Sequence, residues 1–293
     1  MTMSKKLVFF GSGPVAAASL ELLAADFDIE AVITKPKPAY HRGEVPVLAT
    51  ADKLKLPVFT AANRSELDQL ISTKSLSSQL GILIDFGIIV SQKVIDYFPL
   101  GIINSHFSLL PQWRGADPIT FAVLSGQPKT GVSLMLLVPA MDEGPLLAYA
   151  EYNMSPGITT PKLTGELIKL SQALLKETIP KYLAGKLQPV PQTAIKASVS
   201  YSRKLTKSDG AIDWQKPAAE IERQVRAFQG WPKSQAKIFG NDVIITKSRV
   251  AKDKSDGDLV IKCQPGWLEI EELIAPSGRT MSSADFLRGY KKS

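Results

Sequence analysis

Cysteine and histidine are scarce in this chain of 293 residues, which contains one Cys and two His. A single cysteine excludes a disulfide framework and any cysteine-rich zinc site. Two histidines leave too few imidazoles for a histidine-based metal centre, so we expect no metal. This usage is typical of proteins in a reducing compartment, and we expect a cytoplasmic protein.

Long apolar runs and targeting segments are also lacking. No stretch approaches the roughly 18–20 apolar residues that a membrane-spanning helix needs. The first six residues lead directly into the strand-like segment LVFF, without the features of a signal peptide. We therefore expect a soluble monomer that has no membrane partner.

Basic residues exceed acidic ones, and the excess lies in the last third of the chain. The formal net charge is +7. Residues 1–193 contain 17 basic and 16 acidic side chains, whereas residues 194–293 contain 18 basic and 12 acidic ones. Clustered Lys and Arg attract polyanions because they displace the counterions condensed on phosphates. The asymmetry indicates a polyanionic partner; an ordinary solvated Lys-rich surface is the alternative.

Apolar strands alternate with helical stretches over the first half of the chain. We expect strands at 7–10, 29–34, 81–84, 101–104 and 131–138, and helices at 15–25, 46–55, 92–97, 117–124 and 163–183. This alternation predicts parallel βαβ units. The expected fold class is α/β, with a Rossmann-like, doubly wound and mostly parallel sheet in a first domain of residues 1–184.

The pattern changes after residue 184. Residues 185–200 contain Pro189 and Pro191 and lack periodicity, so we expect a linker there. A helical stretch at 218–228 is followed by short strands at 236–239, 242–247, 258–263 and 267–275. Short strands separated by turn residues predict a smaller C-terminal β-barrel domain, OB-like, over residues 201–293.

A glycine turn separates the first expected strand from the first helix. Gly11, Gly13 and Ala16 fit the start of a dinucleotide-binding fingerprint. That fingerprint also requires an acidic residue about twenty positions later for the ribose. The second strand ends instead in Thr34-Lys35, which favours a simple tight turn over a nucleotide site.

The segment IINSHFSLLPQWRG, residues 102–115, is the richest in reactive side chains. We expect Asn104, His106 and Asp142 each just past a strand, at the edge of a parallel sheet where ligands bind. A carboxamide donates to a developing oxyanion, a histidine accepts a proton, and a carboxylate holds that histidine in the required state. Ser105 and Ser108 lack a nucleophile elbow, which favours direct group transfer. A buried structural histidine is the alternative.

Two motifs in this region carry a resemblance to a known family. INSHFSLLPQWRGADPI and GVSLMLLVPAMDEG closely resemble the motif pair NxHxSLLPxxRGxxPI and TGVTxxxxxxxxDxG of the 10-formyltetrahydrofolate-dependent formyltransferases. The segments YSRKLTKSDGAIDWQKPAAEIERQVRAFQGWPKS and GRTMSSADFLRGY resemble the C-terminal domain of the methionyl-tRNA formyltransferases. The likeness covers nearly the whole chain.

The resemblance implies a catalytic triplet of Asn104, His106 and Asp142. Asn104 and protonated His106 would stabilise the oxyanion formed when an amine attacks the formyl carbon, and Asp142 would orient His106 and assist proton transfer. It also implies a set of residues that flank the formyl donor, 10-formyltetrahydrofolate. These are Ile84, Phe86, Gly87, Ile88, Ser108, Leu109, Leu110, Pro111, Val138 and Met141.

The resemblance further implies that the amine belongs to methionyl-initiator tRNA, which gives the basic second half a candidate partner. Contacts would be mainly to phosphates and RNA shape. The candidate residues are Arg42, Lys204, Lys207, Arg223, Arg226, Lys233, Lys247 and Arg249.

Three departures from the family pattern accompany the likeness. The basic loop after the second strand, residues 35–47, is shorter than usual. Phe107 stands where the family commonly has Gly, and Asp85-Phe86-Gly87 stands where it often has Ala-Tyr-Gly. The alternatives are a sugar-nucleotide N-formyltransferase, a non-catalytic RNA-binding protein and an NAD-dependent oxidoreductase. Retention of the triplet disfavours the second, and the missing ribose acid disfavours the third.

Overall fold

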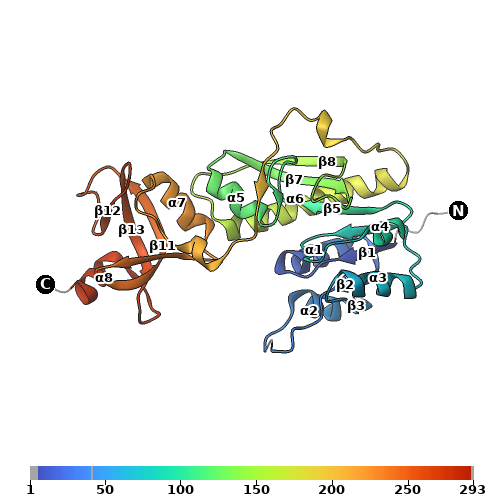
Figure 1. Cartoon of the computed structure of the whole chain (residues 1–293), viewed down its shortest axis with the longest axis horizontal. Coiled ribbons are helices and arrows are strands. Elements are labelled where there is room, and N and C mark those ends of the chain that lie inside the picture. Colours follow the sequence, from blue (N-terminus) through green and yellow to red (C-terminus); the bar gives the residue numbers. More distant parts are fainter. Residues whose placement is uncertain (1–5, 41, 292–293) are drawn as a thin grey trace. The chain divides into compact units, whose positions relative to one another are not determined.

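The computed structural model describes residues 6–40 and 42–291. Contacts divide the chain into two compact units, each built from several segments (Figure 1). The first unit comprises Met1–Gly115, Thr130–Tyr152 and Gly165–Tyr201. The second unit comprises Ala116–Lys129, Asn153–Thr164 and Ser202–Ser293.

A seven-stranded sheet forms the centre of the first unit, with strand order β3-β2-β1-β4-β5-β7-β8. The strands are β1 (Lys6–Phe10), β2 (Asp28–Thr34), β3 (Val58–Thr60), β4 (Leu80–Leu83), β5 (Ile102–His106), β7 (Lys129–Leu136) and β8 (Leu146–Asn153). The pairs that link β3, β2, β1, β4 and β5 are parallel, and β7 joins β5 antiparallel. The predicted α/β fold with a mostly parallel sheet is confirmed.

Helices pack on both faces of this sheet (Figure 1). They are α1 (Pro14–Asp26), α2 (Pro46–Lys53), α3 (Arg64–Thr73), α4 (Gln92–Asp96) and α6 (Thr160–Leu183). Val8 of β1 packs with Leu67 of α3 and Val94 of α4 in one apolar cluster. On the other face, the hydroxyl of Ser105 in β5 lies 2.7 Å from that of Ser171 in α6. In the described part of the chain, no helix has the length and apolar character required to cross a membrane.

Two expectations about strands are wrong. Asn104 and His106 do not follow a strand, because β5 continues through His106. In the sheet, the neighbour of β5 is β7, which runs antiparallel to it, so the C-terminal ends of the two strands lie at opposite ends of the sheet. The loop after β7 must turn back to bring Asp142 to β5. Periodicity along one strand does not reveal the direction of its neighbour, which depends on long-range pairing.

Several elements have no counterpart in the sequence prediction. β3 and α3 lie between residues 56 and 79, and β8 follows the Asp142 loop. α3 nevertheless begins at a recognisable cap: the Asn63 side chain accepts from the Glu66 amide at 3.0 Å, and the Glu66 carboxylate accepts from the Ala62 amide at 2.8 Å. Such a pair satisfies free amides at a helix start.

The second unit contains a curled antiparallel sheet that forms half of a barrel, in the orange and red part of Figure 1. Its strands are β10 (Ser234–Ile238), β11 (Asn241–Ala251), β12 (Val260–Lys262), β13 (Trp267–Ile274) and β14 (Thr280–Ser282), and its helices are α5 (Pro118–Ser125), α7 (Ala218–Ala227) and α8 (Ser283–Tyr290). β13 pairs with β11 on one edge and with β12 and β14 on the other. The fully buried Phe286 of α8 packs with Ile270 and Leu273 of β13.

The segment 185–200 is ordered against the first unit. Val190 and Leu146 exchange two backbone hydrogen bonds of 2.8 Å, and Gln192–Ala194 form a short 3₁₀ helix. Ile195 packs against the buried Leu110 and Met135. The segment predicted as a linker therefore forms part of the first unit's structure.

Candidate active site

β5 presents Asn104 and His106 on one face, because alternate residues of a strand point the same way. Both are almost fully buried, with 8% and 6% of their surface exposed. Asn104 lies in the middle of the sheet, paired with Leu83 of β4 on one side and Met135 of β7 on the other. Two buried polar side chains are thus held side by side on one face of a central strand.

Asp142 reaches these two residues from the loop between β7 and β8. Its Oδ1 lies 3.4 Å from Asn104 Nδ2 and 3.7 Å from His106 Nδ1, and its Oδ2 accepts from the Gly115 amide at 2.7 Å. Asp142 has φ 53°, a left-handed conformation that few residues other than glycine adopt. Such strain costs on the order of 1–3 kcal/mol and persists only where the surroundings hold it.

The imidazole of His106 is oriented from both sides. Its Nε2 lies 2.9 Å from the carbonyl oxygen of Trp113. A carbonyl oxygen only accepts hydrogen bonds, so this partner assigns a proton to Nε2. Nδ1 is the nitrogen that faces Asp142.

The chemistry available here is proton transfer and stabilisation of negative charge. The nearby serine hydroxyls are engaged elsewhere: Ser105 pairs with Ser171, and Ser108 donates to the Gln112 carbonyl. Across residues 6–40 and 42–291, no group of three or more His, Cys, Asp or Glu side chains is arranged to hold a metal. The three groups fit direct transfer to an incoming nucleophile.

The segment after β4 contains four of the residues predicted to flank the donor. Ile84 and Phe86 are buried, and Phe86 belongs to the apolar cluster beneath the sheet edge. Gly87 is exposed and Ile88 is half-buried. The backbone at Gly87 and the side chain of Ile88 are therefore accessible to a ligand, whereas the side chains of Ile84 and Phe86 are not.

The SLLP loop is packed into the protein. Ser108 is fully buried, and Leu110 packs in a cluster with Met135, Leu146 and Ile195. Leu109 is half-buried and Pro111 is buried. In the loop after β7, Val138 is half-buried and Met141 is 66% exposed. Of this set, Leu109, Val138 and Met141 have accessible side chains.

The glycine turn before α1 is filled by the protein itself. A Cβ atom added at Gly13 would lie 1.8 Å from Oδ2 of Asp85, so this carboxylate rests directly against the turn. The Ser12 amide also donates to the Asp85 carbonyl at 3.0 Å. A pyrophosphate would meet a negative charge here, which agrees with the preference for a simple turn.

Four of the predicted RNA-binding cations have partners in the second unit. Arg223 Nε donates to the Leu124 carbonyl at 3.0 Å, and Arg226 pairs with Glu222 at 2.6 Å. The others lie on β11: Lys247 pairs with Glu271 at 3.0 Å, and Arg249 pairs with Asp256 at 2.9 Å and with Glu269. The Asp256 hydrogen bond raises the pKa of Arg249, and the Glu271 hydrogen bond raises that of Lys247.

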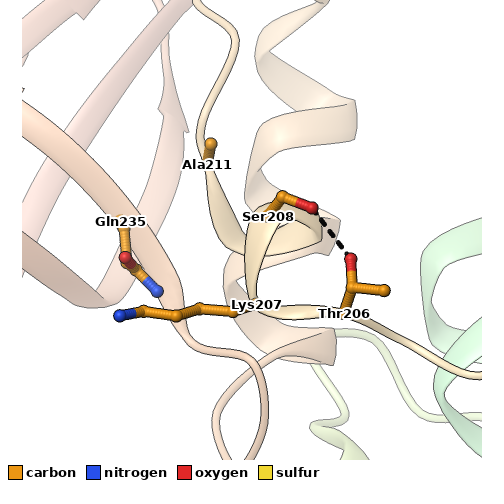
Figure 2. A pocket seen from close by; sticks show the side chains of 5 residues that line it. All are labelled: Thr206, Lys207, Ser208, Ala211 and Gln235. Carbon is orange, nitrogen blue, oxygen red and sulfur yellow. Dashed lines mark hydrogen bonds between the residues drawn. The ribbon is translucent and has the colours of Figure 1, made fainter.

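The remaining predicted cations, Arg42, Lys204, Lys207 and Lys233, are exposed. His41, beside Arg42, lies outside the described residues. In the second unit, the segments around Lys207 and Lys233 run together, since the Ile212 amide donates to the Gln235 carbonyl at 2.9 Å. Figure 2 shows Lys207 extended beside Gln235 in an open pocket that Thr206, Ser208 and Ala211 also line.

Sequence reasoning missed three contributors to the site: the Trp113 carbonyl, the Gly115 amide and the Gln192 side chain. Trp113 and Gly115 lie in the segment 102–115 but act through backbone atoms, which residue type does not reveal. Gln192 lies in the segment predicted as a linker, and no periodicity or motif context marked it.

Two family models match the chain. The model described as formyl transferase matches residues 5–179, and that of the formyl transferase C-terminal domain matches residues 204–291. Proteins named methionyl-tRNA formyltransferase from Roseiflexus castenholzii and Chloroflexus aggregans are 33% and 34% identical to this chain. The alignments cover 99% and 97% of this chain and 97% of each relative. The chain belongs to the methionyl-tRNA formyltransferase family.

Membership of this formyltransferase family confirms the resemblance seen in the motifs and makes the chain an enzyme of formyl transfer. Solved structures agree on the fold. An N-formyltransferase from Helicobacter canadensis, in complex with folinic acid and dTDP-3-aminofucose, superposes with a TM-score of 0.67 at 19% identity, over 93% of this chain and 95% of that one. HypX from Aquifex aeolicus, in complex with tetrahydrofolic acid, superposes with a TM-score of 0.64 at 16% identity. That alignment covers 100% of this chain and 48% of the HypX chain.

Proposed function

We propose that this formyltransferase moves the formyl group of 10-formyltetrahydrofolate to the α-amino group of methionyl-initiator tRNA in the cytoplasm. A bond forms between the amine nitrogen and the formyl carbon, the bond from that carbon to N10 of the folate breaks, and one proton passes from the amine to N10. The main support is that Asn104, His106 and Asp142 lie close together. The chain also has relatives named methionyl-tRNA formyltransferase that align over nearly its full length.

The donor would supply an activated formyl group, and the protein surface beside β5 suits it. Ile88 and Leu137 pack against the same apolar cluster, so the segments after β4 and β7 both contribute apolar side chains to that face. Next to this apolar rim, the Gly87 amide donates to the Ser12 hydroxyl at 3.3 Å, and both residues have polar atoms near the surface. An apolar rim with a few polar groups is typical of a site for a flat heteroaromatic ring.

The three catalytic residues have distinct roles in this proposal. The Asn104 carboxamide and protonated His106 stabilise the negative charge that develops on the formyl oxygen. Asp142 orients His106 through Nδ1 and receives the proton that the attacking amine releases. Groups of this kind contribute about 10²–10⁴-fold each to a rate.

The second unit would hold the tRNA through exposed cations. Arg223, Arg226, Lys247 and Arg249 already have partners within that unit. We therefore assign phosphate contacts chiefly to Lys204, Lys207 and Lys233, with Arg42 of the short loop at the acceptor end. Such contacts recognise phosphates and shape more than base sequence.

The corresponding division of the chain is a catalytic domain at 1–184, a connecting segment at 185–200 and a tRNA-binding domain at 201–293. The matched ranges of the two family models, which end at 179 and begin at 204, support it. Helix α5 groups with the second unit by its contacts, so the catalytic segment of the chain also contributes to the surface beside α7.

Formyl transfer assays with two acceptors test the function. Purified protein is incubated with 10-formyltetrahydrofolate and either methionyl-initiator tRNA or an amino-sugar nucleotide. We expect formylmethionyl-tRNA, with no product from uncharged tRNA, because the acceptor is the methionyl amine. Product from the amino sugar alone would instead identify a sugar-nucleotide formyltransferase. Binding of tRNA without transfer to either acceptor would indicate a non-catalytic RNA-binding protein.

A further inference from the structure

Gln192 connects the segment 185–200 to the loop that carries Asp142. Its side chain is 5% exposed. Nε2 donates to the carbonyl oxygens of Asp142 and Gly144, both at 2.8 Å. Oε1 accepts from Arg114, at 3.2 Å from Nε and 2.8 Å from a terminal nitrogen. Both the nitrogen and the oxygen of the Gln192 side-chain amide thus form hydrogen bonds with other residues of the protein.

The orientation of this amide follows from its partners. A guanidinium group has only donors, so the atom facing Arg114 must be the oxygen, and the two carbonyls then meet the nitrogen. Arg114 also forms an ion pair with Glu143 at 3.2 Å. Glu143 lies in the sequence between Asp142 and Gly144, whose carbonyl oxygens accept from Gln192. The loop 142–144 is therefore held by a hydrogen-bond network in which every donor faces an acceptor.

The bound loop is also the strained one. Asp142 has φ 53°, and a residue other than glycine keeps such a conformation only when its surroundings enforce it. Two residues later, a Cβ atom added at Gly144 would lie 1.8 Å from the Leu136 carbonyl oxygen, so the loop backbone is pressed against β7. Gln192 contacts the loop at both of these positions.

We propose that Gln192 is a positioning residue of the transferase: it holds the backbone of Asp142 in the left-handed conformation that aims the carboxylate at Asn104, His106 and the Gly115 amide. This inference rests on the proposed function, since it assigns Gln192 to the site of formyl transfer. Gln192 does not touch the reacting atoms in this proposal. It acts through Asp142.

The segment that carries Gln192 has other anchors, which makes the side chain testable by itself. Val190 pairs with Leu146, and the Ser200 hydroxyl accepts from the Trp113 amide at 3.0 Å. Ile195 packs against Leu110. Loss of the Gln192 amide therefore leaves the segment in place and removes its hydrogen bonds to the loop and to Arg114.

The test uses Gln192→Met in the full chain, with Gln192→Ala as a second variant. Met keeps the length of the side chain and removes the amide. We expect kcat for formyl transfer to fall by about ten- to a hundredfold, because a catalytic group displaced by about 1 Å costs on that order. KM for tRNA should stay within about twofold. The Gly115 amide should exchange with solvent faster by a similar factor, since Asp142 Oδ2 no longer stays on it.

Gln224→Met is the matched control. Gln224 is 7% exposed, and its Nε2 also donates to two backbone carbonyls, those of Gly210 and Ala211, within the second unit. This variant should lower thermal stability to a similar extent and leave both kcat and Gly115 exchange unchanged. A purely structural role for Gln192 would make the two variants alike.

Two results would overturn the proposal. One is a folded Gln192→Met protein with wild-type kcat; the other is unchanged exchange of the Gly115 amide. Failure of the proposed function gives a different pattern, because the wild-type protein itself would then show no transfer, while amide exchange would still report whether Gln192 holds the loop.

Discussion

Asp142 is the residue on which the hydrogen bonds of the site converge. Its two carboxylate oxygens face two donors, Asn104 Nδ2 and the Gly115 amide, as well as the His106 ring. An asparagine at this position has one acceptor oxygen and one NH₂ group. One of the two donors would then face another donor.

We expect Asp142→Asn to lower kcat by about 10²–10⁴-fold, since in the proposed mechanism Asp142 orients His106 and receives the proton. The free energy of unfolding should fall by only about 1 kcal/mol, the usual effect of one poorly satisfied hydrogen bond. Single-turnover formylation and urea unfolding measure the two quantities. Asp26→Asn, which disrupts the exposed Lys176 ion pair in the same unit, should leave kcat unchanged. Near-normal transfer by Asp142→Asn would remove Asp142 from the mechanism.

At the scale of elements, Arg223 forms a hydrogen bond between α7 and α5. Arg223 of α7 donates to the carbonyl of Leu124, near the end of α5. Its side chain also covers Gly126, where an added Cβ would lie 2.8 Å from Arg223 Cδ. Gly126 caps α5 with φ 71°. A cation predicted from sequence to contact RNA thus closes the end of a helix.

Arg223 and Lys207 should separate stability from RNA binding. We expect Arg223→Ala to reduce the free energy of unfolding by about 1–2 kcal/mol, because a half-buried carbonyl loses a charged donor. Lys207→Ala should leave stability unchanged and weaken tRNA binding, because this side chain is exposed. Urea unfolding and filter binding provide the readouts. The reverse assignment of effects would contradict the division between structural and binding cations.

A second such cation is Arg249 of β11, which pairs with Asp256 in the turn between β11 and β12. Asp256 accepts from Arg249 and from the Lys252 amide, both at 2.9 Å. The hydrogen bond from Arg249 is the largest effect and lowers the pKa of Asp256 to about 2. A carboxyl group with a pKa lower in the folded than in the unfolded state stabilises the fold above its unfolded pKa of about 4.

This contribution should disappear as the pH falls from about 4 to about 2, because protonation then removes the acceptor charge in the folded state. We expect the free energy of unfolding of the wild-type protein to drop over this range. Asp256→Asn should show a shallower drop, with the difference between the two proteins largest above pH 4. Urea unfolding at several pH values measures this. Parallel pH curves for the two proteins would show that Asp256 has no part in the acid response.

At the scale of the whole molecule, the charge of the chain is divided between its two halves. The near-neutral part contains the proposed transfer site, and the basic part contains Lys204, Lys207 and Lys233 on its surface. Binding that depends on phosphate contacts weakens steeply with salt, whereas the buried groups beside β5 are screened little.

Raising salt from about 50 to 200 mM should therefore increase KM for methionyl-tRNA by about tenfold or more and change KM for the folate less than about twofold. Steady-state kinetics at four salt concentrations gives both slopes. Lys204→Ala should reduce the tRNA slope by about one unit, and Lys169→Ala, an exposed lysine of α6 paired with Glu166, should not. Equal salt effects on both substrates would count against the basic surface.

The sequence by itself determined the fold class and the family, because apolar periodicity depends on local geometry and the family motifs have fixed spacing. It also predicted the triplet of the proposed transfer site and identified the basic half. The direction of β7, the return of the Asp142 loop and the attachment of residues 185–200 depended on tertiary structure, since long-range pairing and backbone hydrogen bonds leave no local pattern. Tertiary structure alone also decided which cations are paired, because Arg223 and Arg249 look the same as Lys207 until their carbonyl and carboxylate partners are in place.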